Sequence, residues 1–186
     1  MINKITLNKL YITSTLLLCI LTYLLNHCKA IYECALIFTA IAITVNTVTA
    51  ARGRFKSLTA LGLAIIISFA LLWKIPYYID GRLVNGLVVA SFSSLMVSLY
   101  FSVSAFAKFY SRFGFVIANA LSLCIAAIID GFIMRLFFTI NNNFSYARIM
   151  DIFNKELSYK ILYGLLASAI IFVALRLLKN DAKAKV

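Results

Sequence analysis

The chain has 186 residues, of which 63% are hydrophobic and 13% are charged, and its mean hydropathy is +0.98. This composition excludes a water-soluble globular domain, because there are too few polar side chains to cover the surface of a protein of this size. The formal net charge of +12 does not indicate nucleic-acid binding, since the lysines and arginines stand in short clusters between apolar runs, as in membrane proteins. We therefore expect an all-α, polytopic membrane protein whose surroundings are lipid.

Apolar runs separated by charged residues predict six transmembrane helices in one bundle, which forms a single domain over residues 1–186. Each run is close to the ~20 residues that cross a bilayer. The first run resembles a signal peptide but lacks a small-residue cleavage pair, so we expect an uncleaved helix. The predicted spans are 10–26, 32–51, 57–75, 83–107, 113–140 and 159–178.

The distribution of lysine and arginine predicts the orientation of this bundle. If the N-terminus is cytoplasmic, the inner segments carry most of these residues, and the positive-inside rule then places both termini in the cytoplasm. The inner segments hold Lys4, Lys9, Arg52, Arg54, Lys56, Lys108, Arg112, Arg176, Lys179, Lys183 and Lys185, whereas the outer segments hold Lys29, Lys74, Arg82, Arg148, Lys155 and Lys160.

Three features are expected on the outer side. Trp73, Tyr77 and Tyr78 form a cluster typical of an interfacial aromatic belt. The mixed-charge stretch in residues 141–159 predicts either an amphipathic helix on the membrane surface, which covers a cavity, or a solvated connection. Cys28 and Cys34 share one short loop, where they are either two free thiols or a disulfide in an oxidising compartment.

Polar and small residues recur at helical spacing in three of the predicted spans. Such stripes indicate helix faces that turn toward a common interior, where they either pack helices closely or contact a ligand. They consist of Thr39, Asn46 and Thr49 in the second span, Ser91, Ser94, Ser98 and Ser102 in the fourth, and Asn119, Ser122, Ala126 and Asp130 in the fifth.

Asp130 is the strongest functional candidate. It lies inside an apolar run, where an ionisable group is costly and is usually kept for a pathway or a ligand. The alternative is a structural pairing with Lys160, Arg135 or a backbone donor, although Arg135 is expected to extend to the interface. We expect neither an enzyme nor a bound metal or other cofactor: the only histidine, His27, has no second metal ligand at a useful spacing, and no phosphate loop or nucleophile motif is present.

Three stretches resemble the queuosine-precursor transporter family, also called the vitamin-uptake-transporter-like family. They are FTAIAITVNTVTAARG at 38–53, ASFSSLMVSLYFSVSAFAK at 90–108 and SLCIAAIID at 122–130, followed by Lys160 where that family has a lysine opening the last helix. The chain departs from the family pattern at Asn46, where the family usually has an aspartate, and at Leu99 and Ser102, where it usually has a glutamine and an aspartate.

The resemblance implies a six-helix protein of the bacterial inner membrane that takes up a 7-deazaguanine such as preQ0 or preQ1, or queuine. Its small-molecule partner is then a purine-like base bound by Asp130, Asn46, Ser122, Lys160, Ser102 and Asn119, with Phe92, Tyr100 or Phe132 stacked on the ring. The alternatives are a substrate-binding subunit that docks on an ATPase module of the energy-coupling-factor type, or a structural membrane protein without transport. Assembly into a homo-oligomer is open.

Overall fold

The computed structural model describes residues 4–28, 30–79, 82–141 and 144–184 of the chain. Lys29 and Lys185, two of the cations used to predict the orientation, lie outside the described residues. The elements in chain order are α1 (Lys4–Leu25), α2 (Ile31–Arg52), α3 (Arg54–Leu72), β1 (Tyr78–Ile79), β2 (Arg82–Leu83), α4 (Leu87–Asn141) and α5 (Tyr146–Ala184).

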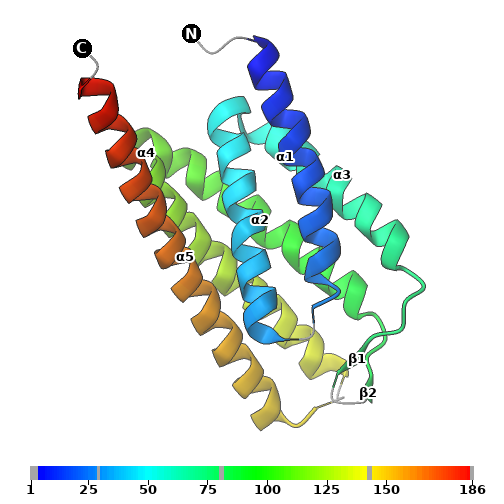
Figure 1. Ribbon diagram of the computed structural model, residues 1–186. Helices are drawn as coiled ribbons and strands as arrows, with labels where there is room; N and C mark the ends of the chain where they lie inside the picture. The colour runs from blue at the N-terminus through cyan, green and yellow to red at the C-terminus, as the bar shows by residue number, and fades with distance from the viewer. Residues whose placement is uncertain (1–3, 29, 80–81, 142–143, 185–186) are drawn as a thin grey trace.

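The structure confirms an all-α bundle built for an apolar environment. Five helices of the described chain are long and apolar enough to cross a membrane. Large apolar side chains cover the outside of the bundle; Ile66 is 66% exposed and Ile170 is 69% exposed. A surface of this kind is stable in lipid, where an exposed isoleucine has no water to avoid. The two chain ends lie at the same end of the bundle, opposite the short β1–β2 hairpin (Figure 1).

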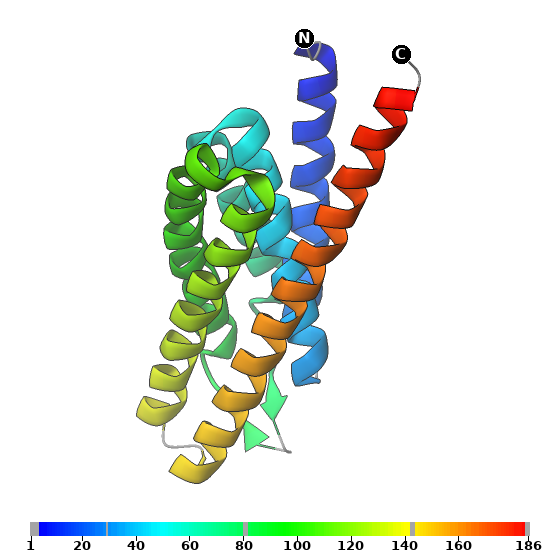
Figure 2. The same ribbon diagram turned by 90° about the vertical axis from the view of Figure 1, so that its left-hand side faces the viewer.

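Helix α4 consists of two helical arms that meet at Gly114 and run back alongside each other (Figure 2). The first arm covers residues 87–113 and the second covers 115–141. Gly114 has φ 74° and ψ −179°, a backbone conformation that is essentially restricted to glycine. The arms are joined further down by a hydrogen bond from Ser102 Oγ to the carbonyl oxygen of Ser122, at 3.0 Å. The turn therefore converts one apolar stretch into an antiparallel pair of helices.

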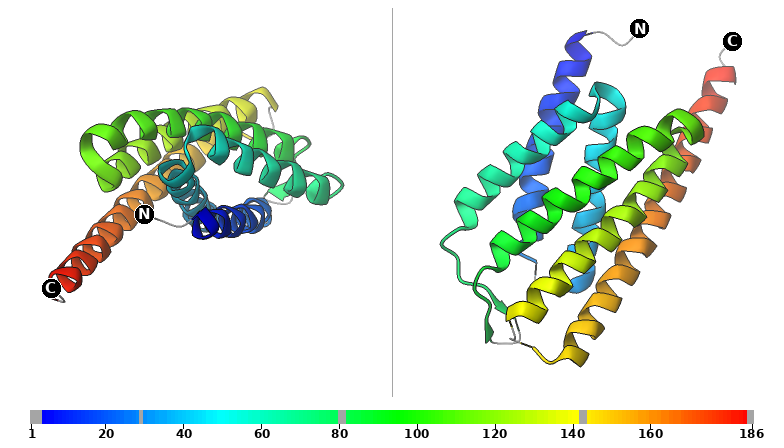
Figure 3. Two further views of the ribbon diagram at one scale, coloured as in Figure 1. Left: turned by 90° about the horizontal axis from the view of Figure 1, so that it is seen from above. Right: turned by 180° about the vertical axis from the view of Figure 1, so that it is seen from behind.

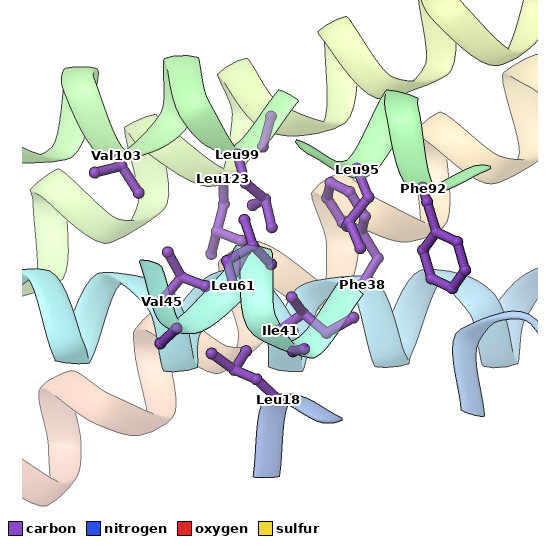
Figure 4. Packing of buried hydrophobic residues seen from close by; sticks show 14 of the residues in the cluster. Leu18, Phe38, Ile41, Val45, Leu61, Phe92, Leu95, Leu99, Val103 and Leu123 are labelled. Carbon is purple, nitrogen blue, oxygen red and sulfur yellow. The ribbon is translucent and has the colours of Figure 1, made fainter. Parts of the chain in front are cut away.

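Helix α2 is the centre of the bundle, since it packs against α1, α3, α4 and α5 (Figure 3). Its apolar side chains Phe38, Ile41 and Val45 are buried against Leu95 and Leu99 of the first arm of α4 (Figure 4). Leu18 of α1, Leu61 of α3 and Leu123 of the second arm complete this core. Among the described residues, α5 contributes no buried side chain to the cluster, so other contacts must hold it in place.

The predicted polar stripes face the interior, as expected. Thr39, Asn46 and Thr49 are buried in α2, and Ser94, Ser98 and Ser102 are buried in the first arm of α4. Some hydroxyls bond back to their own helix, as Thr39 does to the carbonyl oxygen of Ala35 at 2.9 Å. Others join neighbouring helices: the hydroxyls of Thr22 and Ser68 lie 2.7 Å apart between α1 and α3, and those of Thr49 and Ser57 lie 2.8 Å apart between α2 and α3.

The predicted element boundaries were wrong at two places on the hairpin side. Residues 146–159 are neither a separate surface helix nor a solvated loop; they form the first turns of α5, which runs unbroken to Ala184 because no proline interrupts it. The fourth span begins at Leu87 rather than at residue 83, since Arg82–Leu83 pairs with Tyr78–Ile79 in the hairpin. That pairing directs the chain back into α4 within a few residues.

The turn at Gly114 predicts a selective sensitivity to substitution. Gly114→Val should lower the free energy of unfolding by about 1–3 kcal/mol, because a β-branched residue is strained at this positive φ even though the space beside it is open. Gly62→Ala is the matched control, since Gly62 lies inside α3 with ordinary backbone angles and equally open space. Thermal unfolding of the detergent-solubilised protein, followed by the fluorescence of Trp73, tests both variants. Equal effects of the two substitutions would contradict the assigned role of Gly114.

Candidate functional site

A cavity of about 430 Å³ opens between the helices at the hairpin end of the bundle. Its wall is built from helix faces whose residues recur every four positions, the spacing that places side chains above one another on a helix. The lining residues are Leu25, Asn26, Cys28, Ile31, Cys34 and Phe38, then Tyr77, Tyr78, Leu87 and Ser91, then Asp130, Met134 and Phe138, and finally Arg148, Ile152, Glu156 and Lys160.

Three charged side chains meet at the inner end of this cavity. The Lys160 ammonium donates hydrogen bonds to Asp130 Oδ2 and to Glu156 Oε1. The Lys160 and Asp130 side chains are only 2% and 8% exposed, and Glu156 is 19% exposed. Lys160 also lies over the ring of Phe38, with its ammonium 4.3 Å from the ring centre. We call Asp130, Lys160 and Glu156 the ion triad.

The remaining oxygen of Asp130 is held by the first arm of α4. Ser94 Oγ donates to Asp130 Oδ1 at 2.6 Å, so each carboxylate oxygen has one partner. A carboxylate has about four lone-pair positions in total, which leaves room for further donors from the cavity. Asp130 is thus tied to both a cation and a hydroxyl, as a buried charge requires.

A glycine beside Asp130 lets α5 approach the second arm closely. A Cβ atom on Gly131 would lie 2.9 Å from Cε2 of Phe153, a distance that side chains do not tolerate. Arg135, one turn further along, donates to the hydroxyl of Tyr146 at 2.9 Å and lies over the rings of Tyr146 and Phe153. It therefore binds at the outer end of α5 and takes no part in the triad, in line with the expectation that it extends away from Asp130.

Four of the six predicted site residues lie in a second polar group, apart from the cavity. Asn46 Nδ2 donates to Asn119 Oδ1 and to Ser122 Oγ, both at 2.9 Å, and Asn119 Nδ2 donates to Ser168 Oγ at 3.3 Å. Ser102 joins through its bond to the Ser122 carbonyl oxygen. All are buried and none lines the cavity. We call Asn46, Ser102, Asn119, Ser122 and Ser168 the amide cluster.

The amide cluster lies deeper in the bundle than the ion triad. Ser122 precedes Asp130 by eight residues on the same arm, which corresponds to ~12 Å along the helix axis. The cluster connects α2, both arms of α4, and α5. Asp130 and Lys160 therefore line the cavity, whereas Asn46, Ser102, Asn119 and Ser122 cross-link the helices beneath it.

The expected stacking aromatics do not face the cavity. Phe92 is buried in the apolar core, while Tyr100 and Phe132 are 45% and 60% exposed on the outside of the bundle. The aromatic rings of the cavity wall belong instead to Phe38, Tyr77, Tyr78 and Phe138. The choice of Tyr100 and Phe132 was wrong because each lies two residues, or ~200°, away from the polar stripe on its own helix.

Tyr77 is a cavity residue rather than only a member of an aromatic belt. A hydrogen bond from the Val84 amide to the Tyr77 carbonyl oxygen, at 2.9 Å, closes the hairpin and keeps Tyr77 half-buried. Its hydroxyl oxygen is buried and has no hydrogen-bond partner among the described residues. Burial, with a smaller effect of Tyr23, raises the pKa of this phenol, so the hydroxyl is protonated at neutral pH and offers both a donor and an acceptor.

Cys28 and Cys34 both line the cavity, and both are free thiols. Cys34 Sγ contacts the carbonyl oxygen of Cys28 at 3.8 Å. Burial, and then the nearby Glu33 carboxylate, raise the pKa of the Cys28 thiol above its usual value. Within the described residues, no group of three or more histidine, cysteine or acidic side chains is arranged to hold a metal ion.

Comparisons of the chain with protein families, with curated proteins and with solved structures find no match. The cavity and the ion triad are therefore the structural features from which a function can be inferred.

Removal of the shared cation should destabilise the bundle strongly. Lys160→Met leaves Asp130 and Glu156 as neighbouring buried carboxylates without a cation, and we expect it to lower the free energy of unfolding by about 3–5 kcal/mol. Lys155→Met is the matched control: Lys155 is also paired with an acid four residues earlier, Asp151, but its side chain is 55% exposed, so its loss should change stability by less than ~1 kcal/mol. Thermal unfolding in detergent measures the difference, and similar values for the two variants would contradict a buried triad.

Proposed function

We propose that the protein crosses the membrane six times and that both termini are cytoplasmic in the inner membrane of a bacterium. Three observations support this arrangement. The two arms of α4 run antiparallel from Gly114 and each arm is long enough to span a bilayer. Both chain ends and the turn at Gly53 lie at one end of the bundle. Arg52, Arg54, Lys108 and Arg112 lie next to the turns at that end, as the positive-inside rule requires for the cytoplasmic side.

This topology predicts where a reporter enzyme will be active. Alkaline phosphatase, which folds only outside the cytoplasm, should be active when fused after Tyr77 and inactive when fused after Arg112. A fluorescent protein on the C-terminus should be bright, because it folds in the cytoplasm. An active phosphatase at Arg112 would contradict the passage of α4 through the membrane as two spans.

The function that the cavity supports best is the binding and transport of a small, flat, nitrogen-rich molecule, such as a 7-deazaguanine precursor of queuosine. The observation that carries this proposal is a cavity of small-molecule size with two carboxyl groups, both paired with Lys160, at its inner end. Aromatic rings of Phe38, Tyr78 and Phe138 offer stacking surfaces on its wall. The N–H groups of a guanine-like edge are suitable donors for the carboxylate oxygens of Asp130.

Transport requires that the same site open to the other side of the membrane. In the present arrangement the cavity is bounded toward the termini by the ion triad and, ~12 Å deeper, by the amide cluster. Movement of cargo toward the cytoplasm would break the hydrogen bonds that join Asn46, Asn119 and Ser168. These bonds are exchangeable, since interhelical hydrogen bonds in membranes contribute only ~0.6 kcal/mol each on average.

Uptake and binding should both depend on Asp130. Asp130→Asn is expected to reduce uptake of labelled preQ1, preQ0 or queuine at least tenfold in proteoliposomes that contain only this protein, because the amide no longer offers an anionic acceptor to the base. The variant should still reach the membrane, since Lys160 keeps Glu156 as its partner. Asp151→Asn, which removes an exposed acid from the outer turns of α5, is the control and should transport normally.

Three outcomes would reject parts of the proposal. Wild-type uptake by Asp130→Asn would remove Asp130 from the binding site. If the wild-type protein alone transports none of the bases but binds one of them, as a rise in thermal stability with ligand concentration would show, it is a capture subunit that needs an energy-supplying partner. If none of the bases raises its stability, this class of cargo is excluded.

A further inference from the structure

The charge distribution around the cavity differs from that of the chain as a whole. The chain carries 18 lysines and arginines but only 6 acidic residues. At the inner end of the cavity the balance is reversed, because the two carboxylates of Asp130 and Glu156 share the single ammonium of Lys160. This is the part of the cavity wall that is best shielded from water.

The other charged groups near the cavity do not cancel this excess. Arg148 lines the outer part of the wall and pairs with Asp151, which also accepts a hydrogen bond from Lys155. These side chains are 42–55% exposed, so solvent and salt screen their effect at the triad. Arg135 does not line the cavity; it lies in a small adjoining pocket that also contacts Glu156, where it donates to the neutral hydroxyl of Tyr146, and Glu33 lies beside Cys28 and adds to the negative side. Among the described residues that line the cavity, Lys160 is therefore the one buried cation, and it is shared by two carboxylates.

Glu156 has the more available of the two carboxylates. Each oxygen of Asp130 already accepts one hydrogen bond from the protein, Oδ1 from Ser94 and Oδ2 from Lys160. On Glu156 the structure shows a donor only at Oε1, among the described residues. Tyr78 and Phe138 contribute aromatic rings to the wall of the same cavity, and the faces of such rings attract cations. The unpartnered hydroxyl of Tyr77 adds a neutral acceptor.

We propose that the molecule carried by this cavity bears a positive charge, an amine cation that binds to Glu156 while Lys160 stays with Asp130. The bound state then contains two carboxylates and two cations in the water-poor interior, whereas a neutral molecule leaves the excess charge uncompensated. This inference rests on the proposed transport function and narrows the cargo from flat heterocycles in general to those with a protonated amino group.

Two probes with the same ring system test the proposal. The aminomethyl form, preQ1, is a cation at neutral pH, whereas the nitrile form, preQ0, is neutral. Titration of the purified full-length protein with each, followed by thermal shift, should show at least tenfold tighter binding of preQ1. In Glu156→Gln the two probes should bind within about twofold of each other, with the affinity for preQ0 unchanged. The variant retains the Lys160–Asp130 pair and removes the second carboxylate, so the two remaining charges balance and the bundle should fold.

The outcomes separate this inference from the function on which it rests. Equal or tighter binding of preQ0 by the wild-type protein upholds a base carrier but overturns the charge selectivity. A preference for preQ1 that persists in Glu156→Gln overturns the role of Glu156. Asp151→Asn removes one carboxylate from an exposed position on the same helix and should keep the full preference for preQ1. If this variant also loses the preference, the selectivity comes from the net surface charge of the protein and not from Glu156, and the inference is overturned. Binding of neither probe rejects the carrier proposal and the inference together.

Discussion

An ammonium group held between two carboxylates is the interaction on which the interior of this bundle depends. A single buried ion in a membrane is costly, and a pair is tolerated only when its hydrogen bonds are complete. Lys160 meets that condition by donating hydrogen bonds to Asp130 and Glu156 at once, and Ser94 donates to the other carboxylate oxygen of Asp130. The same group also joins α5 to α4, because Asp130 lies on the second arm and the other two residues lie on α5.

The helices are organised around two polar layers of different character. The outer layer is ionic and borders a cavity; the inner layer is the amide cluster, which is neutral and densely hydrogen-bonded. Neutral side chains that hydrogen-bond to one another can be buried between helices at little cost in free energy, whereas buried charges need an opposite charge from the protein or from a ligand. Apolar contacts of α2 with α4 surround the layers and keep water out. The interior thus consists of an open part, the cavity beside the ion triad, and a closed part, the amide cluster.

Helical periodicity allowed much of this to be predicted from the sequence. The stripes through Asn46, Ser98 and Asp130 were expected to face inward, and they do. Periodicity gives the face of a residue but not its depth relative to neighbouring helices, which is why Asn46 and Asn119 were grouped with Asp130 in one site. Glu156 was missed although its spacing of four residues from Lys160 was visible, because residues 146–159 were not recognised as the start of α5.

The residues of the cavity wall were harder to predict, because several of them are brought together by contacts between distant parts of the chain. The contribution of Tyr77 requires the hairpin pairing of residues 78–79 with 82–83, and two-residue strands leave no readable alternation in the sequence. The predicted break at residues 108–112, marked by Lys108 and Arg112, falls just before the observed turn at Gly114, which the prediction included in the fifth span. The backbone conformation of Gly114 was not expected from the basic residues.

Helix α5 is attached to its neighbours in an unusual way, and this has a mechanical consequence. Its buried residues within the described part of the span are Lys160, Gly164 and Ser168, which lie one turn apart. Gly164 faces Leu123 of the second arm of α4 closely: a Cβ atom added to Gly164 would lie 3.5 Å from the Cβ atom of Leu123. Gly164 thus stands at a crossing point with the ion triad on one side and the amide cluster on the other. A rigid rod that rocks about such a fulcrum moves its two ends in opposite directions. A tilt of α5 that loosens the ion triad would then tighten the amide cluster, and a tilt that loosens the amide cluster would tighten the ion triad.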